Sequence, residues 1–344
     1  MDQLPAYNAA SSDDARSIAG GIDSSETPVP VLSPSGSHNT GGTDGHGRKT
    51  AGKLLVDLLP PATVTVIVLF WAFGPEAWTS NPLSILVAGS LTTAFVQALE
   101  WVLERHEGWR LNIREFVTDV FYVVLGYTAI AWVSEKLAEE PLRALKHSLG
   151  ITTEWTLHAP FLVQVALVIC LIEFGQYWMH RAMHNWHPLW LTHAPHHHIT
   201  QLNAMKGSVG NPIELFLISL SVVALFDFQL PALFCAFNVL SAVSIFAHAN
   251  VRSNPPLFYS YIFTTIRHHS LHHSVDYEST RCNYGNSLII FDRMFGTYHE
   301  GESTIVGQDE RRRLSIWEQF MFPFQPLIER IKKKQGHKTA SAAK

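Results

Sequence analysis

The sequence predicts an all-α, multi-span membrane protein, and three observations carry this prediction. Apolar residues make up 47% of the 344 residues, whereas Asp, Glu, Lys and Arg make up only 16%. A soluble globular chain would carry about 25% charged residues. Several apolar stretches approach the roughly 20 residues with which a helix crosses a bilayer. The net charge of -4 excludes a nucleic-acid binder that works through a large positive charge.

The apolar stretches define the predicted elements in chain order. Residues 1–50 are rich in Ser, Gly, Asp, Pro and Thr, so we expect a disordered polar tail. Four predicted spans follow, at about Leu54–Phe73, Pro82–Leu103, Phe116–Ser134 and Ala159–Met179. A fifth region, Ile213–Ala247, is too long for one span and is broken near Asp227 and Pro231, which predicts two spans or a re-entrant hairpin. We place the membrane-embedded domain at residues 51–310 and a basic C-terminal tail at 311–344.

The positions of the basic residues predict an orientation. Arg48 and Lys49 precede the first span, and Arg311 to Arg313 follow the last. By the positive-inside rule both termini and the histidine-rich side face the cytoplasm. Lys136, Arg143 and Lys146 lie in the opposite loop and count against this orientation. The predicted location is the endoplasmic reticulum in a eukaryote or the inner membrane in a bacterium. The alternative is a soluble protein with very apolar core helices, which Asp57, Glu100 and Asp119 would favour.

Histidine is the most unusual feature of the composition. Of 19 histidines, twelve lie between residues 180 and 273. Nine of these form two HxxHH groups, one HxxxH group and a single His-Ala-Asn. Residues three and four apart lie on one face of a helix, so their imidazoles can reach a common metal. The candidate ligands are His180, His184, His193, His196, His197, His248, His269, His272 and His273.

Nine ligands exceed the three or four that one tetrahedral zinc takes, and they suit two metals. Imidazole does not by itself determine which transition metal binds. The three cysteines form no CxxC, so a cysteine zinc site is not expected. Because proline is tolerated only in a first helical turn, Pro195 predicts a helix that starts at Thr192 as N-cap.

Together, these motifs resemble the fatty acid hydroxylase / sterol desaturase superfamily of membrane histidine-box oxygenases. The stretch from Glu173 to His184 resembles its first box, which usually begins with Asp where Glu173 stands, and His193 to His197 match its second box. His248-Ala249-Asn250, His269 to Ser274, Asn283-Tyr284-Gly285 and Asp292 to Tyr298 resemble its later segments. Asn211 stands where many members carry His, and His187, His198 and His268 have no assigned role.

The resemblance implies two iron ions, for which zinc can substitute in an isolated protein. It also implies O2-dependent hydroxylation or desaturation of a lipid such as a sterol, fatty acyl chain, sphingoid, ornithine lipid or carotenoid. No nucleotide, haem or flavin motif occurs, so electrons would come from a separate NAD(P)H reductase through cytochrome b5 or ferredoxin. We do not expect a nucleic acid as a partner.

Three further residues are candidates for contacting the histidines and orienting their rings without binding the metal themselves. Glu173 lies seven residues before His180 on a common helix face, and Asn283 and Asp276 follow the last histidine group. We expect Asp292 to cap a helix. Two other classes of function stay open: a histidine-rich membrane metal transporter, with ligands along a pathway within the spans, and a zinc-dependent membrane hydrolase. The hydrolase would need a positioned Glu base, and no HExxH occurs.

Overall fold

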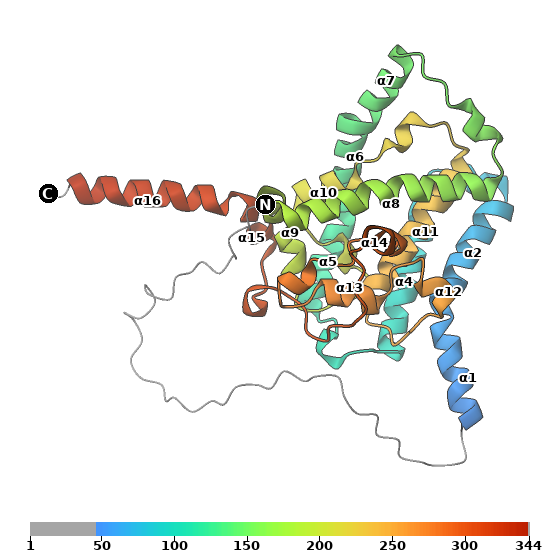
Figure 1. Ribbon diagram of the computed structural model, residues 1–344, viewed down its shortest axis with the longest axis horizontal. Helices are drawn as coiled ribbons and strands as arrows, with labels where there is room; N and C mark the ends of the chain where they lie inside the picture. The colour runs from blue at the N-terminus through green and yellow to red at the C-terminus, as the bar shows by residue number, and fades with distance from the viewer. Residues whose placement is uncertain (1–45, 343–344) are drawn as a thin grey trace. The chain divides into compact units, whose positions relative to one another are not determined.

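The structure is a computed structural model that describes residues 46–342, and within them every regular element is a helix (Figure 1). Two isolated bridges, Glu104 with Val251 and Ser274 with Val306, do not extend into strands. The α-helices are α1 (His46–Asp57), α2 (Leu59–Phe73), α3 (Glu76–Thr79), α4 (Leu83–Val102), α5 (Ile113–Leu125), α6 (Ala131–Ser134), α7 (Glu140–Ser148), α8 (Phe161–Asn185), α9 (His187–His197), α10 (Pro212–Ser219), α11 (Leu230–His248), α12 (Leu257–Ser260), α13 (Ile266–His272), α14 (Ile290–Phe295), α15 (Ile316–Met321) and α16 (Gln325–Ala342). The all-α prediction is confirmed for the described residues.

Four helices are long and apolar enough to cross a membrane, namely Leu83–Val102, Ile113–Ser148, Phe161–Asn185 and Leu230–His248. The first predicted span is shorter than expected, because Pro60 and Pro61 begin a new helix, α2, of only 15 residues. The fifth apolar region divides as predicted near Asp227. Its first half is α10 and a 3-10 turn, η6 (Val222–Leu225), and only its second half, α11, has the length of a span.

The third predicted span continues well beyond Ser134. Helices α5, α6 and α7 form one 36-residue helix, joined by two π-helical segments, η2 (Gly126–Ile130) and η3 (Glu135–Glu139). In Figure 1 the three helices follow one line from α5 to α7. Ion pairs four residues apart, Lys136 with Glu140 and Arg143 with Glu139, support the polar extension. Single-turn π segments are often found at functional sites.

The two predicted terminal tails, residues 1–50 and 311–344, are described only in part by the structure. Residues 1–45 lie outside the described residues, and α1 begins at His46, inside the predicted polar tail. After residue 310 the chain is not a tail, because Leu314, Gln319 and Phe322 are buried. Phe322 packs with Trp190 of α9, and the Asn211 amide donates to the Gln319 carbonyl oxygen at 2.8 Å. The packed part of the chain therefore continues past residue 310.

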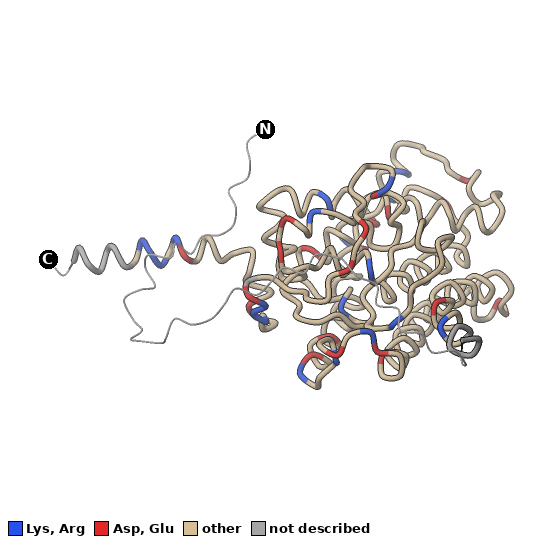
Figure 2. Tube along the Cα trace, turned by 60° about the horizontal axis from the view of Figure 1, so that its bottom comes forward, with Lys and Arg blue, Asp and Glu red and all other residues tan. Residues whose placement is uncertain are grey.

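Buried carboxylates of the first two long helices hold the loops around the histidine-bearing helices. The Glu100 carboxylate of α4 accepts the backbone N–H groups of Ala204 and Asn250, each at 2.8 Å. The Lys206 ammonium lies 2.6 Å from a carboxylate oxygen of Asp119 and also pairs with Glu115 of α5. These polar groups are satisfied inside the protein, as burial requires. Along the chain trace, Lys, Arg, Asp and Glu occupy short stretches separated by long stretches of other residues (Figure 2).

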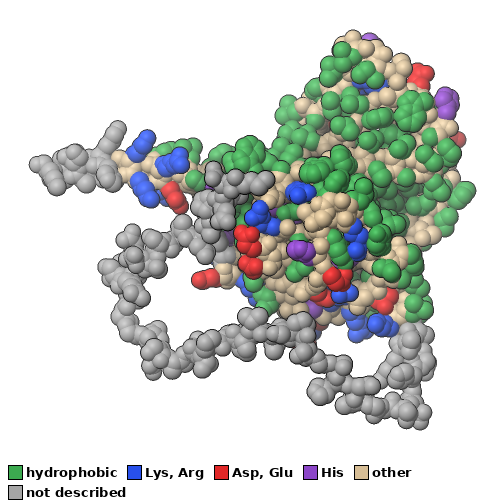
Figure 3. All heavy atoms as spheres, in the orientation of Figure 1, with side chains coloured by type: hydrophobic (Ala, Val, Ile, Leu, Met, Phe, Trp, Pro, Cys, Tyr) green, Lys and Arg blue, Asp and Glu red, His purple; other side chains and the backbone are tan. Residues whose placement is uncertain are grey.

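Apolar side chains also cover much of the surface. Exposed residues include Phe73, Leu91, Val117 and Trp132, each more than half accessible. Figure 3 shows hydrophobic side chains dominating the upper part of the visible face, whereas Lys, Arg, Asp and Glu gather in its lower part. A continuous exposed apolar surface of this kind suits contact with lipid.

Candidate metal centre

The nine predicted ligands come from four helix ends. His180 and His184 lie in the last turns of α8, and His248 is the last residue of α11. Helix α9 presents His193, His196 and His197, and α13 with its C-cap presents His269, His272 and His273. The helix start predicted at Thr192 is wrong: α9 begins at His187 with Pro188 in its first turn, and Pro195 lies inside it.

The structure brings all nine together as two buried groups. The five-histidine group is His180, His184, His193, His197 and His272, and the four-histidine group is His196, His248, His269 and His273. Within each group the candidate ligand atoms lie within 4.8 Å of one another. The two groups interleave, since neighbouring residues of one HxxHH motif, such as His196 and His197, belong to different groups. His197 and His273 stack across the two groups with ring centroids 4.5 Å apart.

The nitrogen spacing fits a shared metal. The His193 Nε2 atom lies 3.0 Å from the Nε2 atoms of His180 and His197 and 3.1 Å from that of His184. In the other group, His269 Nε2 lies 2.9 Å from His248 Nε2 and 3.2 Å from His273 Nε2. Two nitrogens bound to one ion at about 2.1 Å and at right angles would lie about 3.0 Å apart. Each group therefore has the spacing of a first coordination sphere.

Hydrogen bonds on the outer side of the rings explain which nitrogen points inward. The Nδ1 atoms of four ligands lie within hydrogen-bond distance of backbone carbonyl oxygens: His180 of Tyr284 at 2.7 Å, His196 of Val209 at 2.6 Å, His248 of Ser244 at 2.8 Å and His272 of Cys282 at 2.8 Å. An Nδ1–H donor leaves the Nε2 lone pair free to bind metal. The buried His272 Nε2 atom has no hydrogen-bond partner among the described residues, as a metal ligand would.

Among residues 46–342, Glu214 supplies the one carboxylate in direct contact with a candidate ligand. Its Oε1 atom lies 2.6 Å from His193 Nδ1, and both side chains are buried. Asn211 and Glu214 form a capping box at the start of α10, which fixes the carboxylate in place. Glu214 is not among the site residues predicted from the sequence. The Asn-x-x-Glu spacing signals the cap, but not the histidine that the carboxylate would reach.

Burial keeps these imidazoles neutral. It lowers the pKa of His193 to about 3 and lowers the pKa of His269, His272 and His273 well below the usual value. Desolvation is the first cause in each case, because a charged imidazolium loses its hydration. A neutral imidazole is the form that binds metal.

The three residues predicted to orient histidines, Glu173, Asp276 and Asn283, make contacts of three different kinds. Asn283, with a left-handed φ of 51°, donates to the carbonyl oxygens of His268 and His299. It thereby fixes the segment whose Cys282 and Tyr284 carbonyls face the histidines. Glu173 accepts the backbone N–H groups of Ser287 and Leu288, so it holds the following loop and not an imidazole. Asp276 is exposed and caps a turn by accepting from Ser279, which removes it from the site.

Asp292 does more than cap a helix. Its carboxylate is buried and accepts the backbone N–H groups of Tyr284 and Gly285, both at 2.7 Å, and the Thr297 hydroxyl at 2.6 Å. Since the Tyr284 carbonyl faces His180, Asp292 positions that backbone from its other side. Desolvation raises the Asp292 pKa, and the three hydrogen bonds oppose the shift.

Of the three unassigned histidines, His187 lies exposed on α9, and His198 and His268 are buried outside both groups. His198 Nδ1 lies 2.7 Å from the Ala194 carbonyl oxygen, and its ring packs on Phe322. His268 packs against Tyr298. These side chains therefore support neighbouring elements.

Comparison with known proteins agrees with this geometry. Residues 165–297, which include all nine histidines, match the family described as Fatty acid hydroxylase. An ornithine lipid hydroxylase of Rhizobium tropici is 28% identical over 217 residues, 60% of this chain and 65% of that protein. Human alkylglycerol monooxygenase is 30% identical over 158 residues, 44% of this chain and 33% of that protein. A Delta(7)-sterol-C5(6)-desaturase of Nicotiana tabacum is 29% identical over 147 residues, 41% of this chain and 51% of that protein.

The chain thus spans less than two thirds of the length of each of these relatives. No solved structure gives a significant match. The matched segment contains the ends of α8 and α11, all of α9 and α13, and the Glu214 carboxylate, which are the parts that assemble the two histidine groups. Over this segment the chain is similar to the fatty acid hydroxylase family.

Proposed function

We propose that this protein is a membrane oxygenase that uses O2 and external electrons to hydroxylate or desaturate an unactivated C–H position of a lipid. One observation carries the proposal: nine buried imidazoles form groups of five and four at metal-ligand spacing, and three of them lie at the ends of two helices long enough to cross a bilayer. The relatives add support, because their names describe hydroxylation, monooxygenation or desaturation of lipids.

The two groups would each hold one metal ion, and we propose iron. Nine neutral nitrogens and no cysteine suit a metal of intermediate softness, and zinc would compete for the same ligands. When bound, the metal pair supplies the activation of O2. The five-histidine group would use most positions of its ion, whereas the four-histidine group would leave more room for O2.

The overall reaction determines how many electrons and protons the protein must receive for each O2. Hydroxylation places one oxygen atom of O2 into a C–H bond and releases the other as water, which consumes two electrons and two protons. Desaturation instead removes two hydrogen atoms from the lipid and, with the same two electrons and two protons, releases both oxygen atoms as water. We propose an NAD(P)H reductase as the electron source, with cytochrome b5 or a ferredoxin as intermediary. It would act from the cytoplasmic side, which we propose the histidines face.

The residues of the chain exclude water and fix the ligands. All nine histidines are at most 7% exposed, so bulk water has little access to the groups. The Glu214 carboxylate and the carbonyls of Tyr284, Val209 and Cys282 hold the rings in one orientation. This closed arrangement does not resemble a string of sites along a transport pathway, and the Glu214 carboxylate contacts the outer nitrogen of His193, not the side on which a metal would bind.

Lipid profiling under ¹⁸O2 tests the proposal. Membranes from cells with and without the gene are compared, with His196→Ala as the inactive variant and His187→Ala as a matched control on the same helix. We expect one lipid to gain a hydroxyl carrying ¹⁸O, or to lose two hydrogens, with the unmodified protein and with His187→Ala only. Metal analysis of the purified full chain should give two ions. An unchanged lipid profile with reductase present, or a product that persists in His196→Ala, would refute the proposal.

A further inference from the structure

A large cavity lies between the long helices and runs away from the histidines. Its volume is about 1160 Å³, above the roughly 300–1,000 Å³ of ordinary small-molecule sites. Residues from Gly126 to His147 of the α5–α7 helix line it, together with parts of α8, η6 and α11. At 1.5 Å per residue, these 21 steps correspond to about 30 Å, the thickness of the hydrocarbon core of a bilayer. The cavity is therefore long enough for a whole lipid, with its headgroup and one extended acyl chain together.

One end of the cavity lies beside the four-histidine group. Gly207, Ser208 and Ser244 line this end, and the Ser244 carbonyl oxygen lies 2.8 Å from the Nδ1 atom of His248. A Cβ atom added at Gly207 would lie 3.1 Å from the His248 ring, so only a glycine surface separates the ring from the cavity there. Helix α5 packs against the turn that contains Gly207, which places the start of the long helix at this end.

The other end of the cavity is charged, and we call it the charged mouth. It consists of Glu139, Arg143, Lys146, His147, Glu154 and Asp227. Lys146 pairs with Asp227 at 2.6 Å, and Arg143 pairs with Glu139 at 3.1 Å. The Arg143 side chain is 47% exposed, so it can exchange its partner for a ligand. Acidic and basic groups stand side by side, which is the pattern that complements a headgroup carrying both signs of charge.

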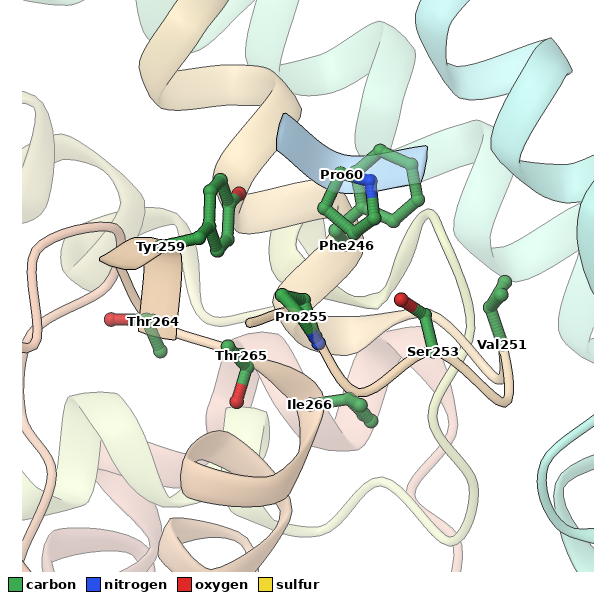
Figure 4. A pocket seen from close by; sticks show the side chains of 9 residues that line it. All are labelled: Pro60, Phe246, Val251, Ser253, Pro255, Tyr259, Thr264, Thr265 and Ile266. Carbon is green, nitrogen blue, oxygen red and sulfur yellow. The ribbon is translucent and has the colours of Figure 1, made fainter. Parts of the chain in front are cut away.

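The wall between the two ends is mainly apolar. Ile130, Ile172, Val223, Phe237 and Leu240 line it, and the small residues Ala131, Ser134 and Ala224 leave the space open. The π-helical segment η2 contributes residues to this wall, whereas η3 contributes Glu139 to the charged mouth. The other cavity described in the structure, against Pro60, Tyr259 and Ile266, has room for only about 10 Å³ (Figure 4). That is about one water molecule, so it does not compete as a lipid site.

We propose that the large cavity binds a zwitterionic lipid whose headgroup lies at the charged mouth and whose acyl chain extends to the four-histidine group. This inference rests on the proposed function for the fate of the lipid, but binding itself needs no oxidation. It assigns the oxidised position to the acyl chain, far from the headgroup. It also gives Arg143 and Lys146 a reason to lie on the membrane face opposite the histidines.

Photo-crosslinking of the purified full chain in nanodiscs tests the inference. The probes are phosphatidylcholine with a diazirine near the end of one acyl chain, the diacylglycerol with the same chain, and a photoreactive cholesterol. We expect the phosphatidylcholine probe to label the inner cavity wall, within Leu240–Ser244 or near Gly207. Ala131→Trp should lower this labelling at least about tenfold by filling the cavity. The matched control, Ala129→Trp, places the same ring on an exposed position of the same helix that does not line the cavity.

The charged mouth is tested with a second pair of variants. Arg143→Gln should lower labelling by phosphatidylcholine about two- to fivefold and leave diacylglycerol labelling unchanged. Lys136→Gln, which removes an exposed ion pair outside the cavity, should change neither. Equal labelling by diacylglycerol or cholesterol would overturn the zwitterionic headgroup, and labelling confined to the outer helix surfaces would overturn the cavity. His196→Ala should still be labelled, so a protein that binds the probe but oxidises nothing would refute only the proposed function.

Discussion

Replacement of Glu214 by glutamine tests whether a carboxylate strengthens the five-histidine group. The Glu214 Oε1 atom lies 2.6 Å from His193 Nδ1, and the two side chains are only 6% and 2% exposed. His193 Nε2 in turn is within 3.1 Å of three other Nε2 atoms, so it is central to its group. Loss of such a carboxylate partner costs about 10–100-fold in metal affinity, which is about 1.4–2.7 kcal/mol. Glutamine keeps only one acceptor oxygen for two donors, the His193 ring and the Asn211 backbone N–H, so we expect at least about tenfold.

The assay is a metal titration of the stripped full chain against a chelator of known affinity, under anaerobic conditions. The unmodified protein should bind two ions, and Glu214→Gln should weaken one of them. The matched control is Glu318→Gln, because Glu318 forms the same kind of capping box with Ser315 at the start of α15. Unchanged affinity at both sites in Glu214→Gln would refute the reasoning, as would an equal loss in Glu318→Gln, which would point to a general effect of capping.

Three further predictions concern stability and the backbone around the centre. Lys206→Met leaves the buried Glu115 and Asp119 without this shared counter-ion, and it should lower the free energy of unfolding by about 3–5 kcal/mol. The control Lys136→Met removes an exposed ion pair and should cost less than about 1 kcal/mol. Both are measured by thermal and denaturant unfolding in detergent. Gly285→Ala places a Cβ atom against the Leu288 carbonyl oxygen, so it should displace the Tyr284 carbonyl from His180. Metal analysis would report this displacement as weaker metal binding. The control Gly175→Ala has open space around the added Cβ atom, so that variant should bind metal normally. Removal of metal should lower the melting temperature, and re-addition at 100 times the dissociation constant should restore about 2.7 kcal/mol per site; no shift in melting temperature would contradict metal binding at the histidines.

The histidines that gather in the two groups could be predicted from the sequence because most of them share local spacing. His180 and His184, or His193, His196 and His197, share a helix face whatever the rest of the chain does. The division into five and four could not be predicted, because His196 and His197 are neighbours that join different groups. That division depends on where α11 and α13 pack. Likewise, Glu173 has the helical phase of a partner for His180, but its carboxylate reaches backbone N–H groups more than 110 residues away in the chain.

The spans show the same limit. Hydropathy located the apolar cores of α4, α8 and α11, since those depend on composition. It ended the third span at Ser134, although the helix continues to Ser148 through charged residues paired four apart. An apolar criterion cannot detect a helix that is stabilised by ion pairs. It also could not find the two π-helical segments, which change the phase of the helix without a distinctive composition.

The buried carboxylates of α4 and α5 have a consequence for how this protein can vary. Glu100, Glu115 and Asp119 lie outside the segment that matches the family, yet they hold Ala204, Lys206 and Asn250 inside it. The matched segment is therefore not an independent module. An excised fragment of residues 165–297 would expose an ammonium and several backbone donors that have no partners of their own. Transplanting the histidine boxes into another membrane scaffold would succeed only if that scaffold offered carboxylates at the same depth.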